Sequence, residues 1–388
     1  MIKTIVPSKK LINFRQNFKN KSNKKNLFGN YLFFPMGRDA LLYGLQTLGV
    51  GKGASIIIPA YMCSSSLEPL NDHGYNIIFQ DINNDLNLDV SLLKENILKH
   101  DVKAIMAVSF FGFLPNSREI SEICSLMDII FIEDYSHSFL SQNHFFKPLR
   151  FSNFAIYSLR KTLTVRDGGV LRINLNKHNK LLGSLEDHYT YSEDNSKLQF
   201  RDIKFIVSCL IEYVIIKSKI INPYSLKIKI IRSFFKRKRT NHHNHLKPLP
   251  IINPSKPSFL LKNYIYDSEG QKQLKDKVLY NYLKLTNGLS KLGFRCLNPD
   301  ISNNCIPQYV VFFDEVGGLV KWLRENKIGS TQWPGEDLPD HVSNSKQLFP
   351  YANLYNDKLV MLPIHQCIKE KHIKRILATM AKWRESKF

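Results

Sequence analysis

Hydrophobic positions along the chain follow two patterns, short continuous runs and longer stretches with a helical period. Five runs have the length of buried strands, and they lie at 56–58, 77–82, 102–112, 129–132 and 154–159. Stretches with helical spacing lie between the first four of them, and one at 117–127 is typical. Strands that alternate with helices predict βαβ units and a mainly parallel sheet. The sequence therefore predicts an α/β fold.

Charged side chains follow directly after two of these apolar runs. One run ends in Glu133 and Asp134, and another ends in Arg160 and Lys161. Ligands gather at the carboxyl ends of parallel strands, and a lysine amine forms Schiff bases with carbonyl compounds such as pyridoxal phosphate. We therefore expect Lys161 to attach an aldehyde cofactor and Asp134 to be its charge partner. The alternatives are a surface lysine and a helix-capping aspartate.

A helix start is predicted near residue 37. Leucines recur at helical spacing across 41–48, and Gly49 has the character of a C-cap. Gly37, Arg38 and Asp39 then lie at the helix N-terminus, where free N–H groups favour an anion such as a phosphate. Most helix starts bind only water, so the phosphate hypothesis depends on what lies nearby.

Several other kinds of site are not expected. The chain has no GxSxG elbow, no Walker lysine motif and no GxGxxG sequence. Its six cysteines are scattered without a CxxC pair, which predicts neither disulfides nor structural zinc and favours a reducing cytoplasm. The histidines at 242, 243 and 245 lie in a basic loop and are expected to be solvated. We predict no metal site.

Positive charge is concentrated in two segments. The chain has 55 Lys and Arg against 33 Asp and Glu, a formal net charge of +22. Residues 1–30 form a basic arm, and residues 201–250 carry twelve basic residues against two acids. The second segment is either a helical insertion with a solvated basic face or a surface that binds an anionic membrane or acidic partner. Nucleic acid is not expected, because Ile and Val rather than stacking aromatics separate the basic residues.

Six segments resemble, in the right order, motifs of the DegT/DnrJ/EryC1/StrS family of pyridoxal-phosphate-dependent sugar aminotransferases. They are MGRDALLYGLQTLGVGKGASIIIPAY, FQDINNDLNLD, SFFGFLPN, IEDYSHSFLS, SLRKTLTVRDGGVL and LPIHQCIKEKHIKRIL. The resemblance implies a fold-type-I architecture, with a mainly parallel seven-stranded sheet and a small C-terminal α+β domain. The expected units are a basic arm 1–30, a cofactor-binding domain 31–200, a basic amphipathic insertion 201–257 and a C-terminal domain 258–388 with a connecting helix.

The resemblance also implies roles for residues around the cofactor ring. Lys161 would hold the cofactor and move the proton between cofactor and substrate carbon, and Asp134 would ion-pair with the pyridine nitrogen. His137 stands where the family has a glutamine near the phenolic oxygen of the cofactor. Cys63 stands where many members place an aromatic ring over the pyridine, and Tyr61 is expected to compensate.

The phosphate turn departs from the family pattern. Gly37, Arg38 and Asp39 stand where the family's small residues bind the cofactor phosphate, and Arg38 can bind a phosphate directly. The family's serine five residues before the lysine is Ile156 here, and Ser158 is expected to substitute. These changes indicate a divergent branch of the family.

The function implied is an aminotransferase that moves an amino group from an amino acid, glutamate being the expected donor, to a nucleotide-linked keto-sugar for surface polysaccharide. A homodimer in the cytoplasm is expected, with peripheral contact at the inner face of the membrane through 201–250. Two alternatives stay open: a pyridoxal phosphate enzyme with another carbonyl or amine substrate, and a non-catalytic homologue that binds a membrane or a partner.

Overall fold

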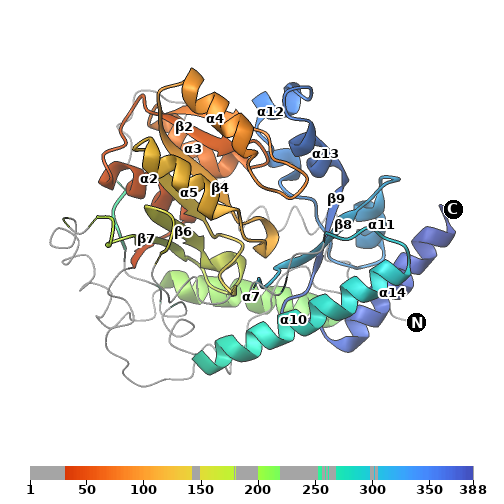
Figure 1. The fold of residues 1–388 in the computed structure, drawn as a ribbon. Coiled ribbons are helices and arrows are strands. Elements are labelled where there is room, and N and C mark those ends of the chain that lie inside the picture. Colours follow the sequence, from red (N-terminus) through yellow and green to blue (C-terminus); the bar gives the residue numbers. More distant parts are fainter. Residues whose placement is uncertain are drawn as a thin grey trace.

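The computed structural model describes residues 31–141, 149–178, 180, 200–218, 252–255, 258, 261, 268–297, 301 and 305–387. The predicted basic arm, the histidines at 242, 243 and 245 and most of the predicted insertion lie outside the described residues. The described chain forms one large sheet with helices around it and a smaller unit toward the C-terminus (Figure 1).

The large sheet has seven strands in the order β1-β7-β6-β5-β4-β2-β3. Their bounds are β1 Leu32–Phe34, β2 Ser55–Pro59, β3 Asn76–Gln80, β4 Val102–Val108, β5 Ile130–Asp134, β6 Phe154–Ser158 and β7 Gly169–Ile173. Strands β2 to β6 run parallel to one another, whereas β7 pairs antiparallel with both β6 and β1. The predicted mainly parallel seven-stranded sheet is confirmed.

Helices cover the sheet because successive strand residues point to opposite faces. Ile57 of β2 packs in one apolar cluster with Leu93 and Ile120, which belong to the helices α4 and α5. Ile56, its neighbour in the chain, packs in a second cluster with Leu45 of α2. The helices that follow the first strands are α2 Gly37–Thr47, α3 Ser64–Asp72, α4 Val90–Lys99 and α5 Ser117–Leu126.

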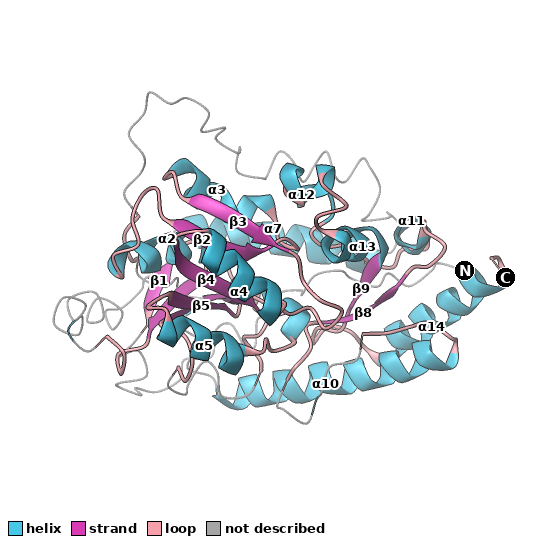
Figure 2. Cartoon of the chain, turned by 45° about the horizontal axis from the view of Figure 1, so that its top comes forward, coloured by secondary structure: helices cyan, strands magenta, loops and turns pink. Residues whose placement is uncertain are grey.

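The C-terminal part is built on a two-stranded antiparallel sheet, β8 Tyr309–Phe313 and β9 Leu359–Pro363. The long helix α10 runs beside the closing helix α14 under this sheet (Figure 2). The remaining bounds are α10 Ser268–Lys291, α11 Leu319–Glu325, α12 Asp340–Asn344, α13 Pro350–Lys358 and α14 Glu370–Glu385. The segment PQYVVFFDEVGGLVKWLRENKIGSTQWP predicts a strand, a helix and a second strand. The second strand does not form, because only the single bridge Thr331–Met361 is present and Pro334 has no N–H to extend it.

Contacts from the ends of β2 and β3 hold the C-terminal part against the large sheet. The carboxylate of Asp81 accepts hydrogen bonds from the N–H groups of Tyr351 and Ala352, at 2.8 and 2.9 Å, at the start of α13. The hydroxyl of Tyr355 donates to the Asn84 carbonyl at 2.8 Å. These bonds place the chain around residue 333 beside the carboxyl ends of the parallel strands.

Helix α7, Phe200–Ser218, is the longest described portion of the predicted insertion. Its N-terminal end is fixed to the loop before β7, since the buried carboxylate of Asp202 pairs with Arg166 at 3.1 Å. No helix within the described ranges combines the length and the apolar character needed to cross a membrane.

Candidate active site

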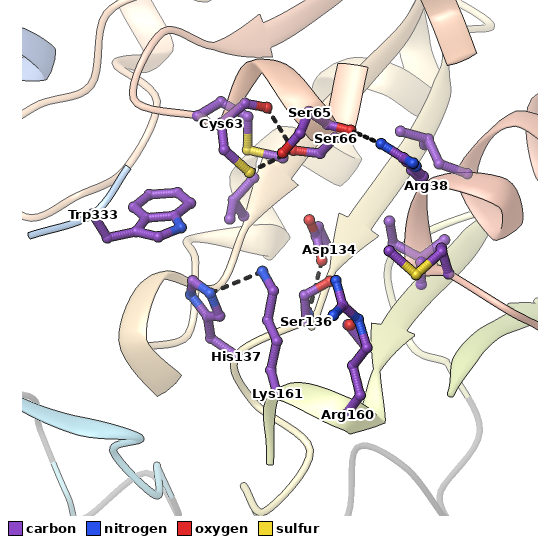
Figure 3. A pocket seen from close by; sticks show the side chains of 17 residues that line it. Arg38, Cys63, Ser65, Ser66, Asp134, Ser136, His137, Arg160, Lys161 and Trp333 are labelled. Carbon is purple, nitrogen blue, oxygen red and sulfur yellow. Dashed lines mark hydrogen bonds between the residues drawn. The ribbon is translucent and has the colours of Figure 1, made fainter. Parts of the chain in front are cut away.

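One pocket lies at the carboxyl ends of β4, β5 and β6 (Figure 3). Asp134 and Ser158, the last residues of β5 and β6, line it together with Lys161 from the turn that follows β6. The start of α2, the start of α3 and Trp333 of the C-terminal part complete the wall. Strand ends, helix N-termini and a distant loop therefore converge on one cavity.

Lys161 is positioned by a short 3₁₀ turn, Leu159–Lys161, between β6 and β7. The Leu159 N–H donates to the Gly168 carbonyl at 2.7 Å, which closes the loop before β7. Gln308 of the C-terminal part donates to the Lys161 carbonyl at 2.7 Å. The main chain of Lys161 is thus held from both parts of the molecule, and its side chain rises into the pocket (Figure 3).

Glycine is required where β7 begins. A Cβ on Gly169 would lie 2.1 Å from the carbonyl oxygen of Met36, the residue before α2. This close approach brings the N-terminus of α2 to the strand ends that carry the lysine. The pair Gly168 and Gly169, at the end of the lysine-bearing segment SLRKTLTVRDGGVL, therefore joins the lysine turn to the predicted phosphate turn.

Asp134 and its neighbour Glu133 point to opposite sides of β5. Glu133 is buried and accepts hydrogen bonds from the hydroxyls of Ser117, Tyr135 and Ser152. One oxygen of Asp134 accepts from the Ser136 N–H at 2.8 Å, and the other has no hydrogen-bond partner in the described part of the chain. Asp134 is 5% exposed and lines the pocket, so its second oxygen is open to a buried cation or N–H donor.

His137 connects the pocket to the turn after β4. Its Nε2 lies 3.0 Å from the Lys161 amine, and its Nδ1 accepts from the Phe111 N–H at 3.2 Å. The ring stacks on Phe111 with an interplanar angle of 8° and meets the edge of Trp333, with centroids 5.3 Å apart. Burial lowers the pKa of His137 well below its ordinary value, so the ring is neutral at neutral pH.

Two guanidinium groups face the anion-binding end of the pocket. Arg38 donates to the Ser65 carbonyl at 2.7 Å and pairs with Glu68. Arg160 lines the pocket and makes no hydrogen bond or ion pair with any residue that the structure describes. Loss of water around this guanidinium, and then the charge of Arg38, lower the pKa of Arg160. Since Arg38 is already paired with Glu68, Arg160 is the guanidinium that stays open to an anion such as a phosphate beside the N-terminus of α2.

Most of the residues predicted for the site line this one pocket. They are Gly37, Arg38, Cys63, Asp134, His137, Ser158 and Lys161. Cys63 precedes α3, and its sulfur lies 2.8 Å from the Ser66 hydroxyl. Sequence reasoning missed Trp333, Ser65, Ser66 and Ser136, and it gave Arg160 no role.

Two predicted residues lie outside the pocket and need correction. Tyr61 is fully buried, and its hydroxyl donates to the Trp333 carbonyl, so it packs in the core instead of covering a ligand. Asp39 accepts from the Met36 N–H at 3.2 Å and caps α2. Its carboxylate is turned to the backbone, where it would repel a phosphate.

The donor set indicates what the pocket can hold. It combines a lysine amine, a buried carboxylate with one open oxygen and two guanidinium groups. These groups fit a ligand with an aldehyde, a basic aromatic nitrogen and a phosphate. The part of the chain described here has no group of three or more His, Cys, Asp or Glu residues placed to hold a metal ion.

Sequence relatives include enzymes that act on nucleotide sugars. The chain is 40% identical over 100 residues to a GDP-4-keto-6-deoxy-D-mannose 3-dehydratase of Escherichia coli, which covers 26% of each protein. It is 27% identical over 165 residues to a GDP-perosamine synthase of the same species, covering 42% of this chain and 45% of that enzyme. The chain thus aligns with less than half the length of these curated relatives.

Solved structures share the whole fold. An aminotransferase of the DegT/DnrJ/EryC1/StrS type from Brucella abortus superposes with a TM-score of 0.65 at 15% identity, covering 92% of this chain and 87% of that one. NtdA from Bacillus subtilis, solved with the bound cofactor PMP, has a TM-score of 0.61 at 14% identity, with 92% and 73% covered.

A family model matches residues 15–200, which contain Asp134, Lys161 and the whole large sheet. The predicted resemblance is confirmed over this region. Through residues 15–200, the chain is similar to the DegT/DnrJ/EryC1/StrS aminotransferase family.

Proposed function

We propose that the protein is a pyridoxal-phosphate-dependent aminotransferase that moves an amino group from an amino acid, glutamate being the expected donor, to a nucleotide-linked keto-sugar. The observation that carries this proposal is the convergence of Lys161 and Asp134 in one pocket at adjacent strand ends. An amine and a buried carboxylate with an open oxygen are the two groups that a pyridoxal ring requires at its opposite ends.

Each pocket residue has a role that follows from its position. When bound, the cofactor supplies an electron sink for the carbon that loses or gains a proton. Lys161 would hold the aldehyde and would move that proton. Asp134 would bind the protonated ring nitrogen through its open oxygen. Arg38 and Arg160 bind the phosphate, and Ser136 and Ser158 offer hydroxyl donors beside them.

The substrate class rests on the relatives and on charge. Their names include GDP-linked and UDP-linked sugars, as in a UDP-2-acetamido-2-deoxy-3-oxo-D-glucuronate aminotransferase of Pseudomonas aeruginosa. A formal net charge of +22 favours a substrate that carries a diphosphate. We propose that the amino sugar produced serves surface polysaccharide synthesis in the cytoplasm.

The first half-reaction tests transamination from the amino-acid donor without knowledge of the sugar. Glutamate alone should convert the protein-bound aldehyde cofactor to its amine form and release 2-oxoglutarate in equal amount. A nucleotide keto-sugar should then restore the aldehyde form. Failure of both steps in protein that visibly binds the cofactor would rule out an aminotransferase.

A second candidate is a pyridoxal phosphate enzyme with a different reaction. Two of the relatives are named as GDP-4-keto-6-deoxy-D-mannose 3-dehydratases, at 40% and 35% identity over 100 and 88 residues. Such a reaction removes water from the sugar and leaves no nitrogen on it. Mass spectrometry of the sugar product, with ¹⁵N-glutamate as donor, separates the two candidates by the presence or absence of the label.

The units and the oligomer are also proposed. Residues 31–200 would form the cofactor-binding domain and residues 258–388 the small domain. A homodimer is supported by the resemblance to fold-type-I enzymes, whose sites are usually completed by the neighbouring subunit. Light scattering of the purified protein measures its mass, and a monomer at working concentration would contradict this proposal.

Peripheral membrane contact is supported by the outer face of α7. Its exposed apolar side chains recur every three or four residues, and they are Phe200, Ile203, Val207, Leu210, Ile211 and Val214. Exposed Arg201 and Lys204 lie beside them. Replacing Ile203 and Val207 by Asp should abolish co-sedimentation with anionic vesicles. Leu98→Asp on α4, which also replaces an exposed apolar side chain, should not. Equal sedimentation of both variants would remove this proposal, which also bears on a non-catalytic binding role.

A further inference from the structure

We propose that His137 is a positioning residue that holds the amine of Lys161 uncharged whenever the amine is not bonded to a carbonyl. An amine with a free lone pair is the form that attacks an aldehyde and accepts a proton. The inference deepens the proposed function and rests on it, because it assigns His137 a task in the chemistry of Lys161.

The imidazole ring of His137 has a fixed orientation. It is 6% exposed, stacks on Phe111 with centroids 6.0 Å apart, and meets the edge of Trp333 at an interplanar angle of 77°. Phe111 lies in a constrained turn, since its φ is 55° and that of Gly112 is 100°. A Cβ on Gly112 would lie 2.5 Å from the Ile306 carbonyl, so the turn is held against the C-terminal part.

This turn determines which nitrogen of His137 carries the proton. The Phe111 N–H points at Nδ1 over 3.2 Å, and the direction of a backbone N–H is fixed by the chain. Nδ1 must therefore accept. A neutral imidazole that accepts at one nitrogen carries its proton at the other, so Nε2 is a donor.

The donor faces Lys161. Nε2 and the lysine Nζ are 3.0 Å apart, which is hydrogen-bond distance. An ammonium group has three donors and no acceptor, so it would oppose the Nε2–H. An uncharged amine accepts from it. The sequence of bonds from the Phe111 N–H through the ring to Nζ is satisfied only with the amine in its neutral form.

Other groups that line the pocket also affect the charge of the Lys161 amine. Arg38 and Arg160 are cations and disfavour a third positive charge. Asp134 favours a positive charge on the amine, but one of its oxygens already accepts a hydrogen bond from the Ser136 N–H. Cys63 lines the opposite wall with its sulfur beside the Ser66 hydroxyl. Because Arg38 is paired with Glu68, Arg160 and Asp134 oppose each other, and the contact with His137 sets the direction.

The first experiment examines the tautomer in the cofactor-free wild-type protein. ¹⁵N NMR of histidine-labelled protein at neutral pH, with the His137 signals assigned by their loss in His137→Gln, should show a neutral ring protonated at Nε2. A ring protonated at Nδ1, or at both nitrogens, would overturn the proposal. The tautomer is read from the wild-type protein. The variant His137→Gln must fold only so that the His137 signals can be assigned.

The second experiment measures the amine itself by competitive acetylation and peptide mass spectrometry. The rate at neutral pH is divided by the rate at alkaline pH for each lysine, which removes differences in access. Lys94, an exposed residue of α4, is the internal reference. The ratio for Lys161 should exceed that for Lys94 by at least about tenfold. Equal ratios would overturn the proposal.

Two variants separate the donor from simple burial. His137→Gln retains an N–H donor and should keep the high ratio of Lys161. His137→Glu offers only acceptors, favours the ammonium form and should lower the ratio to that of Lys94. An unchanged ratio in folded His137→Glu would contradict the mechanism. These experiments use cofactor-free protein, so they do not depend on the proposed function. The proposed function fails in a separate measurement, if the protein shows no absorption spectrum of bound pyridoxal phosphate.

Discussion

Replacing Arg160 by Gln should weaken the binding of pyridoxal phosphate without weakening the fold. The Arg160 guanidinium lines the pocket beside Arg38 and has no hydrogen-bond or ion-pair partner in the described residues, so its removal breaks no such contact there. Its pKa is lowered by loss of water and by the charge of Arg38, so the cation is unfavourable until an anion binds. Arg38 differs, because it also pairs with Glu68 and the Ser65 carbonyl.

The size of the effect follows from the bond that is lost. A hydrogen bond to a charged group contributes about 1.5–3 kcal/mol, so the Kd for pyridoxal phosphate should rise by about 10- to 150-fold. The free energy of unfolding of the ligand-free protein should change by less than about 0.5 kcal/mol. This small change should stabilise the protein, since the repulsion between Arg38 and Arg160 is removed.

The assay compares two ligands that differ only in the phosphate. Pyridoxal phosphate and pyridoxal are titrated into cofactor-free wild type and Arg160→Gln, and binding is followed by absorbance. The variant should lose affinity for pyridoxal phosphate and keep its affinity for pyridoxal. Added salt should weaken phosphate binding more in wild type than in the variant. An equal loss for both ligands, or no loss for either, would refute the reasoning.

Three further variants test other parts of the account. Gly169→Ala places a Cβ 2.1 Å from a carbonyl oxygen and should destabilise the protein by about 3 kcal/mol in urea unfolding, whereas Gly51→Ala, with open space around it, should not. Asp81→Ala removes two bonds to the start of α13 and should lower stability by about 1–2 kcal/mol by the same measurement; no change would mean that these bonds do not hold the C-terminal part. Burial lowers the pKa of His137 in the folded protein, so the histidine takes up a proton at higher pH in the unfolded chain than in the folded one. The wild-type protein therefore loses stability as the pH falls below the ordinary pKa of histidine. Relative to wild type, His137→Gln should gain stability between pH 7 and about pH 5, and parallel pH curves would contradict a buried neutral ring.

The parts of the fold that the sequence predicts are those encoded locally. Asp134 and Lys161 follow directly after apolar runs, so the rule that ligands lie at strand ends was enough to bring them together. Strand β1 escaped prediction because it has three residues and pairs with β7, which lies more than a hundred residues later in the chain. Its identity depends on that partner rather than on its own pattern.

The site errors have a different physical origin. Tyr61 follows β2 closely enough to reach the pocket, but its ring turns into an aromatic cluster and its hydroxyl binds the Trp333 carbonyl. Asp39 lies in a predicted anion-binding turn, but its carboxylate instead caps its own helix. Trp333 enters the pocket from the C-terminal part, so no local signal marks it. Side-chain direction and distant contacts decide these cases.

The central claim is that Lys161 binds pyridoxal phosphate covalently. The most direct measurement is the absorption spectrum of purified protein after addition of pyridoxal phosphate and removal of the excess, followed by borohydride reduction and peptide mass spectrometry. Wild type should show the visible band of a lysine-bound pyridoxal and carry the reduced adduct on Lys161. Lys161→Ala should show neither. A colourless wild type, or an adduct found on a surface lysine only, would contradict the account.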